Sequence, residues 1–153
     1  MSATQSLVTG DHAVPTAIHF AGLELCFLQD RHGTANSLDL FTTTAQPGAG
    51  MPIPHYHEGW DETVYGLSGT VTWTIARQEV AVGPGASAFI PRGVVHGFAN
   101  RSDAPTTFLS VLTPGILGPG YFQETADLLN AGRPDAEAVH ALMRRHGLVP
   151  VMA

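Results

Sequence analysis

The sequence predicts an all-β protein, a double-sheet jelly-roll barrel that is followed by a short α-helical tail. Short segments in which apolar and polar side chains alternate recur through the first 115 residues, as expected of half-buried strands. Turn-forming residues separate these segments, and the chain holds 17 glycines and 11 prolines. A helical period of apolar residues is found only near the C-terminus. Some eight to ten strands without an intervening helix favour a closed double sheet.

Composition limits the classes of function. At 153 residues the chain is most simply one domain, long enough to bury a proper core. The net charge of −6 and the lack of a basic run exclude nucleic acid as an expected partner. All seven basic residues are arginines, so lysine-based Schiff-base chemistry and a Walker-type phosphate loop are excluded as well.

The termini and the single cysteine bear on location. Residues 1–7 have neither a basic start nor an apolar run, so no secretory signal is expected. No apolar segment approaches the roughly 20 residues that span a bilayer, and we expect no membrane partner. Cys26 cannot form an internal disulfide and is interpreted as a strand residue. Together these features predict a soluble, cytoplasmic protein.

The first part of the chain predicts an arm and then strands. Residues 1–16 are small and polar and are expected to form an N-terminal arm. Strands are predicted over 17–20, 23–28 and 36–45, where β-branched, aromatic and leucine side chains concentrate. Residues 46–54 contain three prolines and two glycines, so we expect a loop at the barrel mouth.

The strongest alternation lies in the middle of the chain, where Val71, Trp73 and Ile75 alternate with threonines. A turn over residues 66–69 precedes this strand, and a Gly83-Pro84-Gly85 turn follows the next one. The remaining strands are predicted over residues 61–65, 70–75, 78–82, 87–90, 96–99 and 105–112. We therefore assign residues 17–115 to the barrel.

The pattern changes to a helical one in residues 116–153. Phe122, Ala126 and Leu129 recur at helical intervals. A second helix is predicted to begin after Pro134 with early acidic residues and to end at Gly147. We expect this tail to pack on the barrel, across its open end.

Four metal-binding side chains stand close together in the sequence. His55 and His57 are two residues apart and so point to the same face of a strand, and Glu62 follows five residues later. His96 follows a Pro-Arg-Gly turn at the start of another strand. If these strands are neighbours in one barrel, three imidazoles and a carboxylate meet at one interior point. Such a set suits Fe, Mn, Ni, Co or Zn as the divalent ion.

The spacing of these residues resembles the two sequence motifs of the cupin superfamily. The first is His55-x-His57, then four residues, Glu62, six residues and Gly69. The second runs from Gly85 through Pro91-x-Gly93 and His96 to Asn100. The resemblance covers about a third of the chain. It implies a small single-domain cupin whose metal ligands are His55, His57, Glu62 and His96.

The resemblance also implies a set of reactions. The C-terminal tail, in which a Pro-Gly-Tyr-Phe stretch follows the last strand, is similar to that of quercetin 2,3-dioxygenase-like cupins, so Tyr121 and Phe122 are expected to cover the pocket. This favours a metal-dependent dioxygenase that acts on a small enol or phenol, with Glu62 as the catalytic base. Two alternatives stay open: a non-oxidative lyase or isomerase, for example of the hydroxynitrile lyase kind, and a ligand-binding or sensing cupin without catalysis.

The expected substrate is a small, flat, largely apolar molecule. Apolar side chains on the loop, on the strands and in the tail are candidates for lining its pocket. This predicted set is Met51, Ile53, Trp60, Trp73, Phe98 and Phe122. Trp60, between His57 and Glu62, is expected either at the rim of the site or in ordinary packing. By default we expect a homodimer, formed through the arm or through a sheet face.

Overall fold

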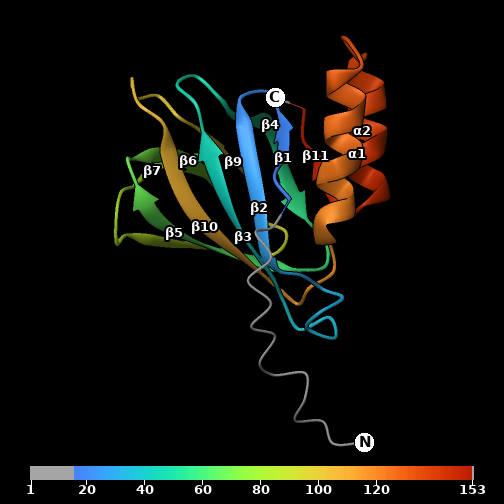
Figure 1. Cartoon of the computed structure of the whole chain (residues 1–153), viewed down its shortest axis with the longest axis horizontal. Helices are drawn as coiled ribbons and strands as arrows, with labels where there is room; N and C mark the ends of the chain where they lie inside the picture. Colours follow the sequence, from blue (N-terminus) through green and yellow to red (C-terminus); the bar gives the residue numbers. More distant parts are fainter. Residues whose placement is uncertain (1–15, 153) are drawn as a thin grey trace, which may run out of the picture.

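Two antiparallel sheets form the barrel in the computed structural model, which describes residues 16–152 (Figure 1). The predicted arm therefore lies almost wholly outside the described residues. The six-stranded sheet has the order β1 (Ile18–Phe20), β2 (Leu23–Gln29), β3 (Asp39–Ala45), β10 (Thr106–Thr113), β5 (Asp61–Ser68) and β8 (Ser87–Ile90). The five-stranded sheet has the order β11 (Leu148–Pro150), β4 (Gly50–His57), β9 (His96–Ala99), β6 (Val71–Ile75) and β7 (Gln78–Val82). The predicted all-β jelly roll is confirmed.

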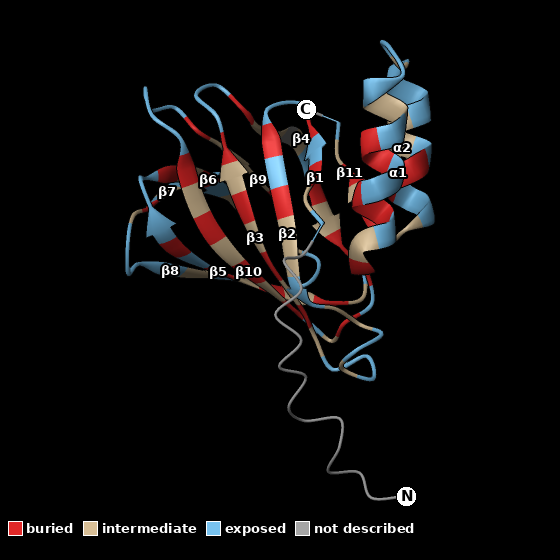
Figure 2. Ribbon diagram, viewed as in Figure 1, coloured by how far each residue is buried: buried red, intermediate tan, exposed pale blue. Residues whose placement is uncertain are grey.

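Strand β10 shows how the sequence pattern sets the two faces of the six-stranded sheet. Its residues alternate between buried and half-buried, so that Phe108, Ser110 and Leu112 point into the barrel. Both of its neighbours, β3 and β5, pair with it antiparallel over nearly its full length. The buried residues of both sheets form the core, and along β10 they alternate with half-buried residues (Figure 2).

The expectation of a loop over 46–54 is wrong in its second half, because β4 begins at Gly50. Gly50 and Met51 pair with β9, and pairing resumes only at His55 after a register irregularity. Proline cannot donate a hydrogen bond to a sheet, but the irregularity removes the need for donors between Met51 and His55. The composition correctly indicated a break in the hydrogen-bond ladder. It did not indicate that β4 continues on both sides of this break.

The C-terminal tail forms helices α1 (Gly118–Asn130) and α2 (Ala136–Arg145), which lie beside the barrel next to β1 and β11 (Figure 1). The Asp135 side chain caps α2 by accepting a hydrogen bond from the Ala138 amide at 2.7 Å. The chain then returns as β11, which pairs with β4 alongside His55 and His57. Strand β11 was not predicted, because an alternating pattern cannot be recognised in a segment of only three residues. None of the described helices is long and apolar enough to cross a membrane.

Candidate metal centre

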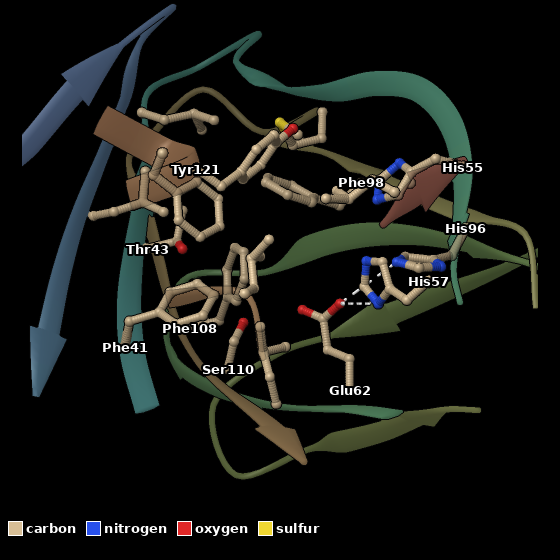
Figure 3. A pocket seen from close by; sticks show the side chains of 18 of the residues that line it. Phe41, Thr43, His55, His57, Glu62, His96, Phe98, Phe108, Ser110 and Tyr121 are labelled. Atoms are coloured by element: carbon tan, nitrogen blue, oxygen red, sulfur yellow. Dashed lines mark ion pairs between the residues drawn. The ribbon is translucent and has the colours of Figure 1, made fainter. Parts of the chain in front are cut away.

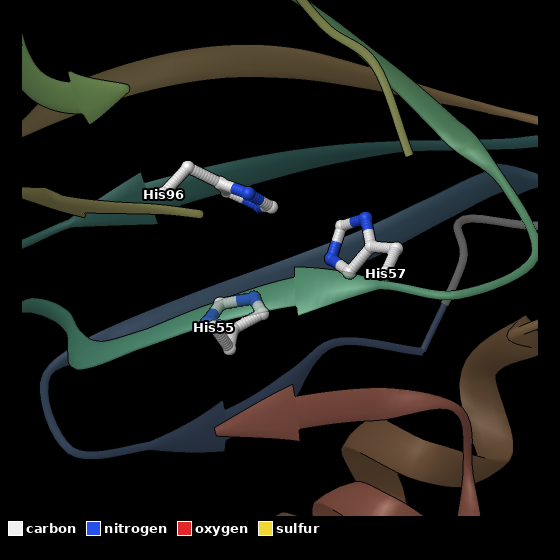
Figure 4. A group of neighbouring side chains, drawn as sticks. All are labelled: His55, His57 and His96. Atoms are coloured by element: carbon white, nitrogen blue, oxygen red, sulfur yellow. The ribbon is translucent and has the colours of Figure 1, made fainter. Parts of the chain in front are cut away.

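His55 and His57 project from β4 into the barrel. The intervening Tyr56 is half-buried on the other face, whereas the two histidines are each only 4% exposed. Strand β11 pairs with β4 at both positions: Pro150 lies opposite His55, and Leu148 lies opposite His57. The period of two in the strand therefore brings both rings to one interior point, as predicted (Figure 4).

His96 joins them from the adjacent strand, since β9 pairs with β4 so that His96 lies directly opposite His55. The turn before β9 fixes this register. Gly93, with a φ of 81°, donates its amide hydrogen to the carbonyl of His57 at 2.9 Å. The second motif is thus hydrogen-bonded to the first, and the centroids of the His55 and His96 rings are 4.6 Å apart.

Glu62 approaches from the other sheet. It lies on β5, is 7% exposed, and directs Oε2 to 3.4 Å from His96 Nε2 and 4.0 Å from His57 Nδ1 (Figure 3). The structure therefore brings together all four residues that the sequence motifs singled out.

The imidazoles of His55 and His96 are oriented by the backbone. His55 Nδ1 lies 2.9 Å from the Ile53 carbonyl and His96 Nδ1 lies 2.9 Å from that of Val94. A carbonyl only accepts, so each Nδ1 carries a hydrogen and each Nε2 keeps its lone pair when the ring is neutral. Such backbone bonds are the usual way in which proteins orient histidines that bind metals.

Burial makes two of the rings poor bases. It lowers the pKa of His55 to about 4 and that of His57 to about 3, so both are neutral at physiological pH. His96 and Glu62 behave as a coupled pair. Burial acts to lower the pKa of His96 and to raise that of Glu62, but the hydrogen bond and attraction between them prevail and shift both the other way.

The four residues fit a divalent ion. The candidate nitrogen atoms of the three histidines lie within 4.8 Å of one another. Bonds of about 2.1 Å place two ligands of one ion at most about 4.2 Å apart, so small side-chain movements suffice. The lone pair of His96 Nε2 faces a carboxylate oxygen, an arrangement that is favourable only with a positive charge between them. A proton or a metal ion supplies that charge.

An apolar cavity extends from these four residues between the two sheets (Figure 3). The space in it that water-sized molecules can occupy is about 50 Å³, enough for a few water molecules. Its wall is mostly aliphatic and aromatic and includes four of the predicted pocket residues: Met51, Trp73, Phe98 and Phe122. Tyr121 and Phe122 of α1 contribute to the wall, as expected of covering residues.

The other two predicted pocket residues do not line this cavity in the structure. Trp60 is 1% exposed and stacks on His57 with ring centroids 4.6 Å apart, behind the site instead of at its rim. The backbone of Gly147, just after α2, lies so close to the same indole that a Cβ there would be 3.1 Å from it. Ile53 is half-buried and packs against the core, and its carbonyl orients His55. Both residues therefore support candidate ligands, Trp60 by packing on His57 and Ile53 by orienting His55.

Sequence reasoning missed two polar side chains in the cavity wall, Thr43 of β3 and Ser110 of β10. Both occupy inward positions whose neighbouring inward residues on the same strand are apolar: Phe41 and Ala45 beside Thr43, and Phe108 and Leu112 beside Ser110. Among residues 16–152, the Ser110 hydroxyl and the indole nitrogen of Trp73 are buried without a hydrogen-bond partner. Threonine and serine are common in strands. Thr43 and Ser110 could therefore have been recognised as cavity residues only from the strand register that turns them inward.

Asp39 was also missed, and it fixes the helix that covers the cavity. Its buried carboxylate accepts hydrogen bonds from the amides of Arg31 at 2.8 Å and Gly118 at 3.0 Å. Gly118 is the first residue of α1, and no side chain of that helix caps it. Asp39 therefore connects β3 to the start of the covering helix.

Comparison with known proteins agrees with this geometry. A family model described as a cupin domain matches residues 41–112, which contain all four candidate ligands. A curated quercetin 2,3-dioxygenase from Bacillus subtilis (strain 168) is 35% identical over 75 residues, which are 49% of this chain and 22% of that protein. The chain thus matches less than a quarter of the length of this relative.

Solved structures share the fold. A sugar phosphate isomerase from Silicibacter pomeroyi, described as of the cupin superfamily, is 32% identical with a TM-score of 0.53, over 60% of this chain and 59% of that one. A polyketide cyclase from Streptomyces resistomycificus is 29% identical with a TM-score of 0.54, over 66% and 69% of the two chains. A predicted oxalate decarboxylase from Thermotoga maritima, 23% identical over 66% of this chain and 92% of that one, has a TM-score of 0.59 and supports the fold alone.

Proposed function

The chain belongs to the cupin superfamily, and on that basis we propose that it is a metal-dependent dioxygenase for a small enol or phenol of the flavonol or diketone type. The ion would be Fe, Ni, Mn or Co, with Zn as a further possibility. One observation carries the proposal: His96 Nε2 and Glu62 Oε2, both electron-pair donors, face each other at 3.4 Å beside two neutral imidazoles at the end of an apolar cavity.

His55, His57, Glu62 and His96 would hold the ion. When bound, it would supply Lewis-acid stabilisation of a substrate oxyanion and, if redox-active, a route for electrons to dioxygen. Glu62 is ionised because its pKa is lowered: burial opposes this, but the hydrogen bond with His96 and the neighbouring imidazoles outweigh it. The carboxylate can therefore accept the proton of a substrate hydroxyl group.

The side chains of the cavity wall indicate which kind of substrate would fit. The aromatic side chains of the wall suit a flat ring. The Ser110 hydroxyl and the Trp73 indole N–H are buried without partners among the described residues, so each would gain a hydrogen bond from an acceptor on the substrate. A ring with an oxygen substituent away from the reacting end satisfies both conditions.

The experiment is oxygen uptake by the full chain loaded separately with Fe, Ni, Mn or Co, on a panel of flavonols and 1,3-diketones. We expect uptake with at least one metal, and a loss of about 100-fold or more in Glu62→Gln, the range for removal of a general base. Glu58→Gln is the matched control, because Glu58 is exposed four residues earlier. Equal uptake by the Glu62 variant, or no uptake with any pair of metal and substrate, would refute the proposal.

A non-oxidative lyase or isomerase is the second candidate. The observation that favours it is that solved structures 32% and 29% identical to this chain are described as an isomerase and a cyclase. The same four residues would then stabilise an enolate without dioxygen. Substrate turnover under nitrogen, supported by Zn, would select this function over the first.

A further inference from the structure

The three candidate histidine ligands are not held in the same way. The rings of His55 and His96 are each fixed by a hydrogen bond between Nδ1 and the backbone carbonyl two residues earlier, both at 2.9 Å. Within residues 16–152, the His57 ring has no such bond to a carbonyl. The nearest charged oxygen, Glu62 Oε2, lies 4.0 Å from His57 Nδ1, which is too far for a hydrogen bond. Another interaction must therefore set the orientation of this imidazole.

The indole of Trp60 supplies that interaction. It stacks on the His57 imidazole with ring centroids 4.6 Å apart and an angle of 23° between the ring planes. The ring of His96 meets the same imidazole edge-on, at 4.6 Å and 85°. The lone pair of an imidazole nitrogen lies in the ring plane, so the stack that fixes this plane also fixes the direction in which His57 can bind an ion.

The indole is held in turn by the C-terminal tail. Gly147 follows α2 with a φ of 84°, and a Cβ there would lie 3.1 Å from Trp60 Cζ3. The Gly147 carbonyl accepts a hydrogen bond from the Glu58 amide at 3.1 Å, and the next residue, Leu148, pairs with His57. The tail therefore contacts both the indole and the backbone beside the ligand that the indole orients.

The choice of tryptophan is not explained by core packing. Trp60 is 1% exposed, and its indole N–H is buried without a hydrogen-bond partner among residues 16–152. Such a group costs stability that a leucine or a phenylalanine would not lose. What the indole adds over these side chains is a large flat face against the imidazole of His57.

We propose that Trp60 is a positioning residue for the metal ligand His57, and that the C-terminal tail acts on the bound ion through Gly147, Trp60 and His57. This rests on the ligand set of the proposed function but not on the reaction. The stack does for His57 what a backbone carbonyl does for each of the other two histidines. Groups that orient a ligand in this way change metal affinity by about 10- to 100-fold when they are removed.

The first test measures the affinity of the full chain, freed of metal, for Co²⁺ by isothermal titration calorimetry. We expect Trp60→Leu to weaken binding by about 10-fold or more. The visible absorption spectrum of bound Co²⁺, which reports the number and geometry of its ligands, should change as well. Trp60→Phe keeps an aromatic ring against His57 and should lose less. Val82→Ala is the matched control, because Val82 is also 1% exposed but lies outside the cavity wall, so its affinity should stay the same.

The outcomes separate this proposal from the ligand set. Circular dichroism verifies that each variant is folded, and Trp60→Phe carries the test, with a several-fold loss expected, if Trp60→Leu does not fold. An unchanged affinity together with an unchanged Co²⁺ spectrum would refute the positioning role and leave the ligands in place. A wild type that binds no Co²⁺ would refute the ligand set and this proposal with it.

The second test acts from the tail. A Cβ at 3.1 Å is closer than ordinary contact, so Gly147→Ala should displace the indole, weaken Co²⁺ binding several-fold and alter its spectrum. Gly48→Ala is the matched control: Gly48 has nearly the same φ, 80°, but a Cβ there meets nothing within 4 Å. Equal Co²⁺ affinities and spectra in the two variants would show that the tail does not act on the ion.

Discussion

At the scale of single residues, the most informative group is the hydroxyl of Ser110. It is buried in an otherwise mostly apolar wall, and it has no hydrogen-bond partner within residues 16–152. A buried polar group without a partner lowers the stability of the folded state unless something else supplies the bond. The Ser110 hydroxyl is therefore expected to contribute more to substrate binding than to the stability of the fold.

Ser110→Ala should separate these two effects. We expect kcat/KM to fall by up to roughly 10-fold, the worth of one neutral hydrogen bond, while the melting temperature stays the same or rises slightly. Ser87→Ala, at an exposed position of β8, is the control and should change neither. Steady-state kinetics and thermal unfolding of both variants check this. A large loss of stability in Ser110→Ala would show that the hydroxyl serves the fold.

Tyr121 gives a prediction about pH. Burial raises the pKa of its phenol from 10.0 to about 12. A group whose pKa is raised by folding stabilises the protein fully below its unfolded pKa, and this stability is lost between about pH 10 and 12. The difference in absorbance at 295 nm between wild type and Tyr121→Phe should titrate with a midpoint of about 12. A midpoint near 10 would mean that α1 does not shield this ring from water.

At the scale of elements, the attachment of α1 decides how the cavity is covered. Asp39 is the side chain that joins β3 to the start of this helix. Its loss leaves two amide hydrogens, those of Arg31 and Gly118, without their acceptor.

Asp39→Ala should therefore lower the free energy of unfolding by about 3–6 kcal/mol, the sum expected for two hydrogen bonds to a charged group. Hydrogen exchange should accelerate most in the first turn of α1. Asp103→Ala, at an exposed turn, is the matched control and should have little effect. Urea unfolding measures the free energy, and a change within the error of the control would contradict this role.

The elements also show what the sequence could predict. Alternation located β6 and β10 well, because each has one buried face, and spacing brought His55, His57, Glu62 and His96 together correctly. Strand β4 was missed before His55 because its ladder is interrupted at the prolines, and β11 because it is short. Asp39 owes its role to a contact with Gly118, 79 residues away in the sequence, which no local pattern encodes.

At the scale of the whole molecule, metal binding should stabilise the fold, since the four donors are in place only in the folded chain. A ligand at 100 times its Kd adds about 2.7 kcal/mol. For a chain of this size this corresponds to a rise in Tm of roughly 5–10 °C.

Differential scanning fluorimetry with and without Co, Ni or Mn measures this rise, and a chelator should abolish it. The rise should be absent in His55→Ala and retained in His32→Ala, where the histidine is exposed. No shift with any divalent ion in the wild type, or an equal shift in both variants, would refute the assigned ligands.

Strand β5 has two sides with different surroundings. Glu62 points inward to the three histidines, while its neighbour Thr63 lies on the outer face of the sheet next to Phe89. Consecutive residues of a strand share one peptide plane, so a substitution on the outer side that shifts the backbone at Thr63 would also shift the Glu62 carboxylate.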